Sequence, residues 1–117
     1  MLYLVTGEWV EVGALLSPEQ VVSILDQTVL PSLERLAQSE EAGRIRGGIF
    51  PGERAGAWVM EADSSEEVGQ FLASLPFWGQ VKWYVRALQT MRSSVEREQG
   101  VREQLQAASR QAASQSL

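Results

Sequence analysis

Two stretches near the ends of the first 90 residues predict β-strands, the first because it is rich in β-branched and aromatic residues and the second because apolar and polar side chains alternate along it. The first strand is expected at residues 2–12, with its odd-numbered side chains on one face, and the last strand at residues 81–88. Between them, residues 44–50 and 55–62 predict a hairpin whose turn contains Pro51 and Gly52. The pattern therefore predicts four strands.

The stretch "LSPEQ" predicts the start of a helix that runs to about residue 42. Ser17 is suited to cap it, Pro18 fits its first position and Gln20 can complete a capping box. Pro31 lies inside this helix and removes one backbone hydrogen bond. The sequence thus predicts either a kink near Thr28 or a break into two helices.

A shorter helix is predicted by "DSSEEVGQFLASLP", where apolar side chains recur at helical spacing. Ser64 and Glu67 are expected to form its capping box, and Pro76 is expected to end it. Within the hairpin, Gly47 and Gly48 indicate a bulge or a close approach of another backbone.

The resulting order of elements is strand, helix, strand, strand, helix, strand, which predicts an α+β, ferredoxin-like βαββαβ fold with an antiparallel sheet. Residues 1–90 form this domain, and residues 91–117 form a polar C-terminal helix or tail. A thin apolar stripe in the tail could lie on a neighbouring subunit or fray in solvent. Its members are Met91, Val95, Leu105 and Ala108.

Composition narrows the possible functions. The chain has 117 residues, of which 44% are hydrophobic and 21% charged, as in an ordinary globular domain. It has neither a run of apolar residues long enough to span a membrane nor the features of a signal peptide, so a cytoplasmic protein without a membrane partner is expected. The absence of cysteine and histidine excludes thiolate chemistry and histidine triads, and we expect no metal or cofactor. The net charge of −5 argues against a nucleic-acid partner.

The segment "ADSSEEVGQFLASLPFWGQVKWYVRAL" and the hairpin "GRIRGGIFPGERAGAWVMEAD" resemble the muconolactone delta-isomerase family over about residues 1–88. The resemblance implies a dimeric α+β barrel, as a homodimer or a larger ring, that moves a proton next to a lactone carbonyl. Glu53 and Arg54 stand where the family has a His-Tyr pair, and Thr6 stands where it has a lysine. Glu34 is the nearest substitute for the family's helical carboxylate.

Alternation also predicts which side chains face a cavity between two sheets. If one face of the sheet, including Val5, Val59 and Trp83, packs against the helices, the other face points into the barrel. The cavity face is then expected to carry Leu4, Thr6, Glu8, Arg46, Trp58, Tyr84 and Arg86. Three charges in a partly apolar pocket suit a small anionic or carbonyl ligand.

From this face we predict a site for a small organic molecule that bears a carbonyl or carboxylate. Glu8 would accept the proton, Arg46 or Arg86 would hold a carboxylate or enolate, and Trp58 and Tyr84 would shape the pocket. The same residues have a simpler interpretation, in which Glu8 forms a cross-strand or intersubunit ion pair with an arginine. The tryptophans could equally form the core and an interface.

Two other functions remain open at this stage. The same fold hosts cofactor-free oxygenases and polyketide-type cyclases, because a fold does not fix a reaction. The chain could also be a non-catalytic assembly protein in which side chains fill the cavity and the tail holds a ring together. Glu53 and Arg54, in the hairpin turn, are expected in solvent or at the pocket mouth.

Overall fold

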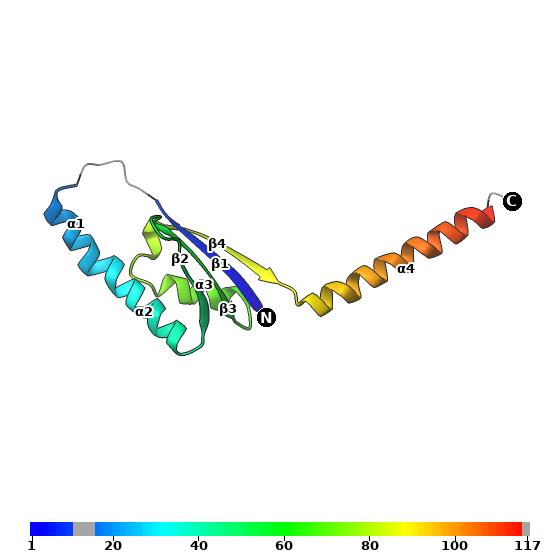
Figure 1. The fold of residues 1–117 in the computed structure, drawn as a ribbon, viewed down its shortest axis with the longest axis horizontal. Helices are drawn as coiled ribbons and strands as arrows, with labels where there is room; N and C mark the ends of the chain where they lie inside the picture. Colours follow the sequence, from blue (N-terminus) through cyan, green and yellow to red (C-terminus); the bar gives the residue numbers. More distant parts are fainter. Residues whose placement is uncertain (11–15, 116–117) are drawn as a thin grey trace.

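Strand β1 (Leu2–Trp9) lies inside a four-stranded antiparallel sheet. The computed structural model describes residues 1–10 and 16–115, so the end of the predicted first strand, residues 11–12, lies outside them. Strand β1 pairs on one side with β3 (Ala55–Glu61) and on the other with β4 (Val81–Leu88), and β2 (Ile45–Ile49) pairs with the far side of β3. The order β2-β3-β1-β4 confirms the predicted ferredoxin-like sheet (Figure 1).

One long helix crosses the sheet. It does not break at Pro31 but contains a π-helical turn just before it. It consists of α1 (Pro18–Ile24), a π-helical turn η1 (Leu25–Val29) and α2 (Leu30–Glu41). In the π turn the N–H of Leu30 donates to the carbonyl of Leu25, and the hydroxyl of Thr28 donates to the carbonyl of Ile24 at 2.6 Å. The disturbance predicted near Thr28 is therefore present, as a π turn within a continuous helix.

The helix ends largely follow the predicted caps. The hydroxyl of Ser17 accepts from the N–H of Gln20, whose side chain bonds back, as predicted. Helix α3 (Ser65–Ala73) is capped by Ser64, but the carboxylate of Glu67 accepts from the N–H of Asp63, at 2.8 Å, and not from Ser64 itself. A 3₁₀ turn η2 (Trp78–Gln80) then leads into β4.

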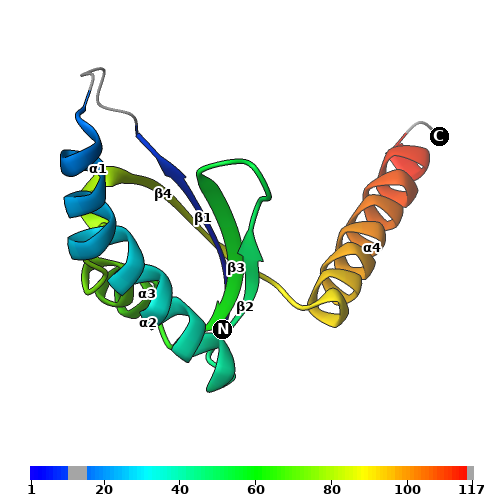
Figure 2. The ribbon, with the colours of Figure 1, turned by 60° about the vertical axis from the view of Figure 1, so that its left-hand side comes forward.

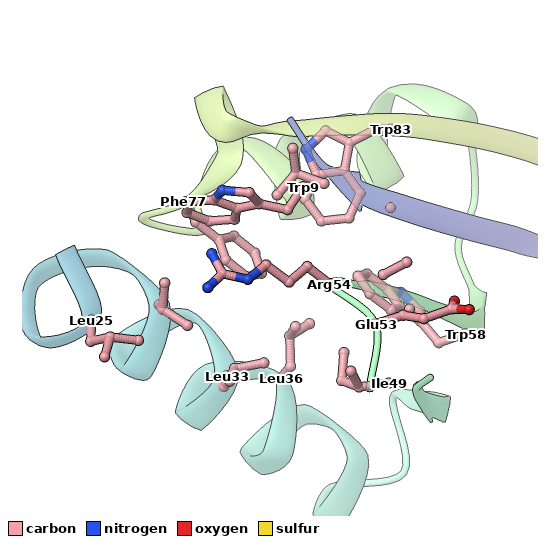
Figure 3. A pocket seen from close by; sticks show the side chains of 15 residues that line it. Trp9, Leu25, Leu33, Leu36, Ile49, Glu53, Arg54, Trp58, Phe77 and Trp83 are labelled. Atoms are coloured by element: carbon pink, nitrogen blue, oxygen red, sulfur yellow. The ribbon is translucent and has the colours of Figure 1, made fainter. Parts of the chain in front are cut away.

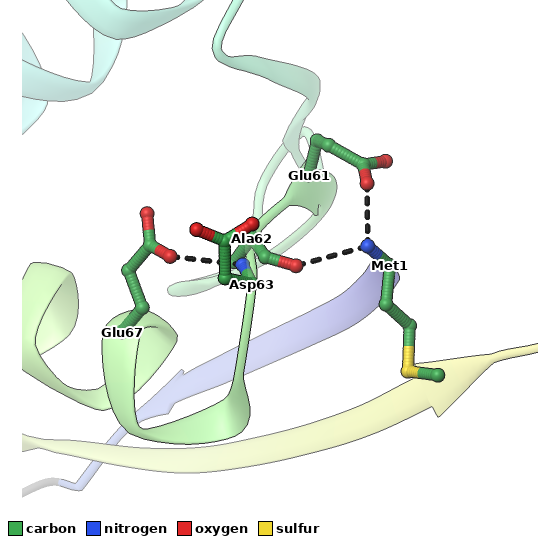
Figure 4. Close-up of polar contacts among 5 residues, drawn as sticks. All are labelled: Met1, Glu61, Ala62, Asp63 and Glu67. Atoms are coloured by element: carbon green, nitrogen blue, oxygen red, sulfur yellow. Dashed lines mark hydrogen bonds and ion pairs between the residues drawn. The ribbon is translucent and has the colours of Figure 1, made fainter.

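Polar contacts hold the end of β3 to the start of β1 (Figure 4). The amino group of Met1 donates to the carboxylate of Glu61 at 2.5 Å and to the carbonyl of Ala62 at 3.0 Å. The ion pair is exposed, so it contributes little to stability, about 0–1 kcal/mol. Its structural effect is to close the strand pair next to the start of α3.

The helices α1, α2 and α3 cover one face of the sheet, and the other face is open (Figures 1 and 2). The covered face carries the core, which contains Tyr3, Val5, Leu36, Ile45, Trp58, Met60, Ala62, Val68, Phe71, Leu72, Leu75 and Phe77. Strand register fixes the faces, because residues opposite each other point the same way. Val5 lies opposite both Trp58 and Val85, so all three share the helix-covered face.

This register corrects two sequence assignments. Trp58 was expected on the cavity face but is 5% exposed beneath the helices, and Val59 was expected beneath the helices but points to the open face opposite Leu4. The two residues are adjacent and both apolar, so alternation alone does not distinguish their faces. Gly47 lies opposite Trp58, and a Cβ there would come within 2.5 Å of the Trp58 Cα, so the predicted close backbone approach is confirmed.

The C-terminal segment is a single helix, α4 (Met91–Gln115), that projects away from the sheet (Figure 1). The described chain extends 81 Å along its longest axis and has a radius of gyration of 22.1 Å. A compact domain of this length would have a radius of gyration of about 13 Å. None of the residues of α4 is buried against the rest of the chain.

Candidate functional site

A pocket opens between the α1–α2 helix and the covered face of the sheet (Figure 3). Its volume is about 250 Å³. It is lined by Gly7, Trp9, Leu25, Val29, Leu33, Leu36, Ile49, Glu53, Arg54, Ala55, Gly56, Trp58, Phe77, Val81 and Trp83. This aromatic pocket, as we call it, is enclosed mainly by apolar side chains, with few polar groups, as is common for sites that bind small molecules.

Four aromatic side chains form its sheet-side wall as a continuous series of edge contacts. The ring of Trp9 lies 6.2 Å from that of Phe77, Phe77 lies 6.0 Å from Trp83, and Trp83 lies 5.7 Å from Trp58. The rings are steeply inclined to one another, at 58° to 71°, a geometry that aromatic pairs favour. The wall therefore offers both ring edges and ring faces to a flat ligand.

Two indole N–H groups at this wall differ in their partners. That of Trp83 donates to the carbonyl of Trp78 at 3.1 Å, which fixes the ring. That of Trp58 is buried and has no hydrogen-bond partner among the residues that the structure describes. A buried donor without a partner is uncommon in folded proteins, so Trp58 brings unused hydrogen-bonding capacity to the pocket wall.

The opposite wall comes from the π turn and the helix that follows it. Leu25 and Val29, the first and last residues of η1, both line the pocket, together with Leu33 and Leu36 of α2. Leu25 is 39% exposed, so it lies at the mouth. π turns are frequent at functional sites, where they re-aim side chains that a regular helix would direct elsewhere.

Glu53 and Arg54 are the only charged side chains among the described residues that line this pocket. The β2–β3 turn holds them there, since the N–H of Trp9 donates to the carbonyl of Arg54 at 2.9 Å and that of Glu53 to the carbonyl of Phe50 at 3.1 Å. In Figure 3 the Arg54 side chain reaches from the turn toward the helix that carries Leu25, and Glu53 points the other way. Both side chains are exposed, as expected for a hairpin turn, and they lie at the edge of a pocket on the opposite side of the sheet from the predicted cavity.

The predicted site residues are divided between the two faces of the sheet. Glu8, Arg46, Tyr84 and Arg86 point to the open face, as expected, whereas Trp58 lines the aromatic pocket. Arg46 and Arg86 belong to one cross-strand row but stand on the two outer strands, roughly 14 Å apart at about 4.8 Å per strand. Glu8 lies four residues along β1 from that row, roughly 13 Å away.

The cross-strand form of the expected ion pair between Glu8 and an arginine is therefore absent from the described residues, and the intersubunit form stays a prediction. The register places Lys82 opposite Glu8 instead. Hydrogen bonding with Tyr84 and then the electrostatic effect of Tyr84 raise the pKa of Lys82 above its ordinary value; desolvation opposes them, and Glu8 adds the smallest upward effect. The ammonium group lies 5.6 Å from the centre of the Tyr84 ring.

A second concavity lies on the open face. Its lining residues are Leu4, Thr6, Tyr84 and Arg86, and its volume is about 260 Å³. It brings together two of the five predicted site residues, Tyr84 and Arg86. No element of the described residues covers this concavity, so enclosure would require a second sheet.

Sequence reasoning missed Trp9, Phe77 and the π turn as parts of one pocket. Trp9 is an even number of residues from Val5, so alternation along the strand predicted that both lie on the same face. Pro31 predicted the position of the disturbed turn. Neither pattern reveals which side chains meet across the fold. Among residues 1–10 and 16–115 there is no cluster of acidic side chains fit to bind a metal ion. Over the same residues, no helix has the length and apolar character that a membrane span requires.

No family model matches the chain, and neither does any curated protein. Among solved structures it is similar to 5-chloro-2-hydroxyhydroquinone dehydrochlorinase (TftG) from Burkholderia phenoliruptrix AC1100 in complex with 2,5-dihydroxybenzoquinone, with a TM-score of 0.53 and 21% sequence identity. The match covers 80% of this chain and 98% of that one. The subunit thus has the α+β fold of dimeric barrels, and membership of the muconolactone delta-isomerase family stays a prediction.

Proposed function

We propose that this protein binds a small single-ring organic compound bearing carbonyl or acidic oxygens, and that it does so in the aromatic pocket. One observation carries the proposal: an otherwise apolar and aromatic pocket has one carboxylate, that of Glu53, and one guanidinium group, that of Arg54, at its edge. Sites of this kind bind the body of a ligand by apolar contact and orient it with a few polar groups.

The size of the pocket supports a one-ring ligand. An apolar cavity of about 150 Å³ accommodates benzene. A volume of about 250 Å³ leaves room for a ring with two or three substituents. TftG is described in complex with 2,5-dihydroxybenzoquinone, a ring of that size whose oxygens are partly acidic, and this chemistry guides the choice of compounds to test.

The two charged residues suit proton transfer next to a carbonyl. The guanidinium of Arg54 would bind the oxygen on which negative charge develops, since arginine pairs well with oxyanions. The carboxylate of Glu53, which is exposed and points away from Arg54, would turn toward the bound ligand, accept the proton as a general base must, and return it at the neighbouring position. In such a step one C–H bond breaks, another forms, and the double bond shifts, which is the isomerase reaction that the family resemblance implies.

A second candidate site is the open-face concavity, where Glu8 was predicted as the base and Arg46, Tyr84 and Arg86 as binding residues. The observation that favours it is the meeting of Tyr84 and Arg86 in one hollow. A ligand there would lie on the opposite side of the sheet from Arg54. The two candidates therefore differ in which charged residues matter.

Binding can be followed through the protein's own tryptophans. Three of the four, Trp9, Trp58 and Trp83, line the aromatic pocket, and Trp78 does not. We would titrate quinones, hydroxyquinols, lactones and aromatic acids, measuring fluorescence quenching and thermal shift together. The proposal expects saturable quenching by one compound class, still present in Trp78→Phe.

Two matched pairs of variants locate the ligand. Leu25→Phe should obstruct the mouth and weaken binding about tenfold or more, whereas Val22→Phe, on an exposed position of α1 outside the pocket, should not. Arg54→Gln should weaken binding of an acidic compound, with Arg86→Gln as the comparison.

To locate the catalytic base, we would compare the rate of turnover in Glu53→Gln with that in Glu8→Gln. If Arg86→Gln lost binding and Glu8→Gln lost turnover, while Arg54→Gln and Glu53→Gln kept both, the site would lie on the open face. If no compound of the panel binds saturably, both candidate sites are contradicted for this class of ligand.

A further inference from the structure

Helix α4 has an apolar face with no partner in the described chain. Met91 is 86% exposed, Leu105 65%, and Val95 and Val101 42% each. A single helix of mixed Gln, Ser and Ala composition with a central glycine is marginal in water, and most helices gain their stability by packing an amphipathic face. The structure of α4 therefore calls for a partner, and its sequence indicates which one.

Six residues of α4 follow the spacing of a coiled-coil seam. Steps of four, three, four, three and four residues connect Met91, Val95, Glu98, Arg102, Leu105 and Ser109. Alternating steps of three and four keep side chains on one side of a helix and are the signature of helix pairs. The side chains of Glu98, Val101, Arg102, Leu105, Gln106 and Ser109 also form a shallow groove along this side.

This seam is symmetric about Gly100. Val95 and Leu105 each stand five residues from it, and Glu98 and Arg102 each stand two residues from it. If a second α4 runs antiparallel with its centre at the same glycine, Val95 meets Leu105 of the other copy, and Glu98 meets Arg102, twice each. A parallel pair in register would instead place Glu98 against Glu98 and Arg102 against Arg102, which like-charge repulsion opposes.

The charges of the seam are available for such pairing. Within the single chain Glu98 contacts its neighbour Arg97 at 3.4 Å, in an exposed pair that holds it weakly. Arg102 forms no ion pair within residues 1–10 and 16–115. The exposed apolar residues and the unused complementary charges thus lie on the same side of α4.

We infer that α4 is an assembly helix that pairs antiparallel with α4 of a second copy of this chain, with two Glu98–Arg102 contacts at the centre and Val95–Leu105 contacts on each side. This surface is distinct from the open sheet face and from the aromatic pocket. It gives the protein a second means of joining copies, independent of any ligand.

Disulfide trapping tests the orientation directly, because the chain has no cysteine of its own. Val95→Cys and Leu105→Cys chains, made with tags of different mass, are mixed and mildly oxidised. Random pairing would give half of all disulfides as mixed 95–105 bonds. If α4 pairs antiparallel, the mixed bonds should make up well over half.

The matched control is Glu96→Cys with Gln104→Cys, which stand at equal distances from Gly100 but outside the seam, and little mixed disulfide is expected there. A preference for 95–95 and 105–105 bonds, a random mixture, or equal trapping at the control positions would overturn the inference.

Charge reversal in these cysteine chains tests the central contact. Arg102→Glu, or Glu98→Arg, places like charges opposite each other and should reduce the mixed disulfide about tenfold. The double variant Glu98→Arg with Arg102→Glu restores opposite charges and should restore trapping. Glu103→Arg, the same kind of change outside the seam, should have little effect.

Recovery in the double variant separates loss of pairing from loss of folding, and circular dichroism checks that α4 stays helical. Trapping that is unchanged by the single reversals, or not restored in the double variant, would contradict the pairing.

Discussion

The hydroxyl of Ser32, on α2, accepts a hydrogen bond from the backbone N–H of Phe77 at 3.0 Å, across 45 residues of sequence. Ser32 is fully buried, and the same hydroxyl donates to the carbonyl of Thr28 at 2.6 Å. Phe77 lines the aromatic pocket directly after Pro76. One hydroxyl thus joins the helix wall of the pocket to the segment that carries its aromatic wall.

Replacing Ser32 by alanine should therefore destabilise the protein by about 1–3 kcal/mol, because the Phe77 N–H would be left buried without a partner. At roughly 4 °C per kcal/mol, the midpoint of thermal unfolding should fall by several degrees. Ser39→Ala is the matched control, since the hydroxyl of Ser39 donates within its own helix, to the carbonyl of Arg35. Equal midpoints for the two variants would show that the Ser32 contact is unimportant.

The two adjacent glycines of β2 should respond oppositely to alanine. A Cβ at Gly47 would lie 2.1 Å from the carbonyl oxygen of Ala57, in the neighbouring strand, whereas a Cβ at Gly48 meets nothing within 4 Å. Gly47→Ala should cost about 1–3 kcal/mol or more, because backbone must move. Gly48→Ala should be neutral or slightly stabilising. Urea unfolding of both variants measures this difference, and similar midpoints would refute it.

Lys82 should lose its raised pKa when Tyr84 is replaced by phenylalanine, because hydrogen bonding with Tyr84 is the main cause of the shift. It is the only lysine, so carbon-13 labelling of lysine gives a single side-chain resonance to titrate by NMR. A pKa raised in the folded state means that the contact stabilises the fold below about pH 10.5, and that this contribution disappears as the pH rises through the raised value. Tyr3→Phe should leave the titration unchanged; an unchanged titration in Tyr84→Phe would refute the assignment.

The open sheet face should mediate a homodimer, as the fold leads us to expect. Val59 and Leu4 lie at the centre of this face, between Arg46 and Arg86. Val59→Arg adds a third positive charge to the row and, in the Arg102→Glu background, where α4 can no longer join copies, should halve the mass measured by light scattering at a fixed concentration. Val22→Arg, on exposed α1, should leave the mass unchanged. A mass unaffected by Val59→Arg would exclude this face as the interface.

Local patterns in the sequence were sufficient to predict the four strands, the helix caps at Ser17 and Ser64, and the disturbed turn near Thr28. These features depend on side-chain alternation, on hydroxyl caps and on the missing N–H of Pro31, all of which act within a few residues. The faces of β1 followed for the same reason, because successive side chains of a strand point to opposite faces, which places Tyr3, Val5 and Trp9 together.

Tertiary structure alone decided the face of Trp58 and the location of the aromatic pocket. Trp58 and Val59 are both apolar, so only the pairing of Val5 with Trp58 determined which of them is buried. The pocket brings together a π turn, a hairpin turn and the segment around Phe77, which are far apart in sequence. Their meeting depends on long-range packing and strand register, and no local pattern of residues encodes these.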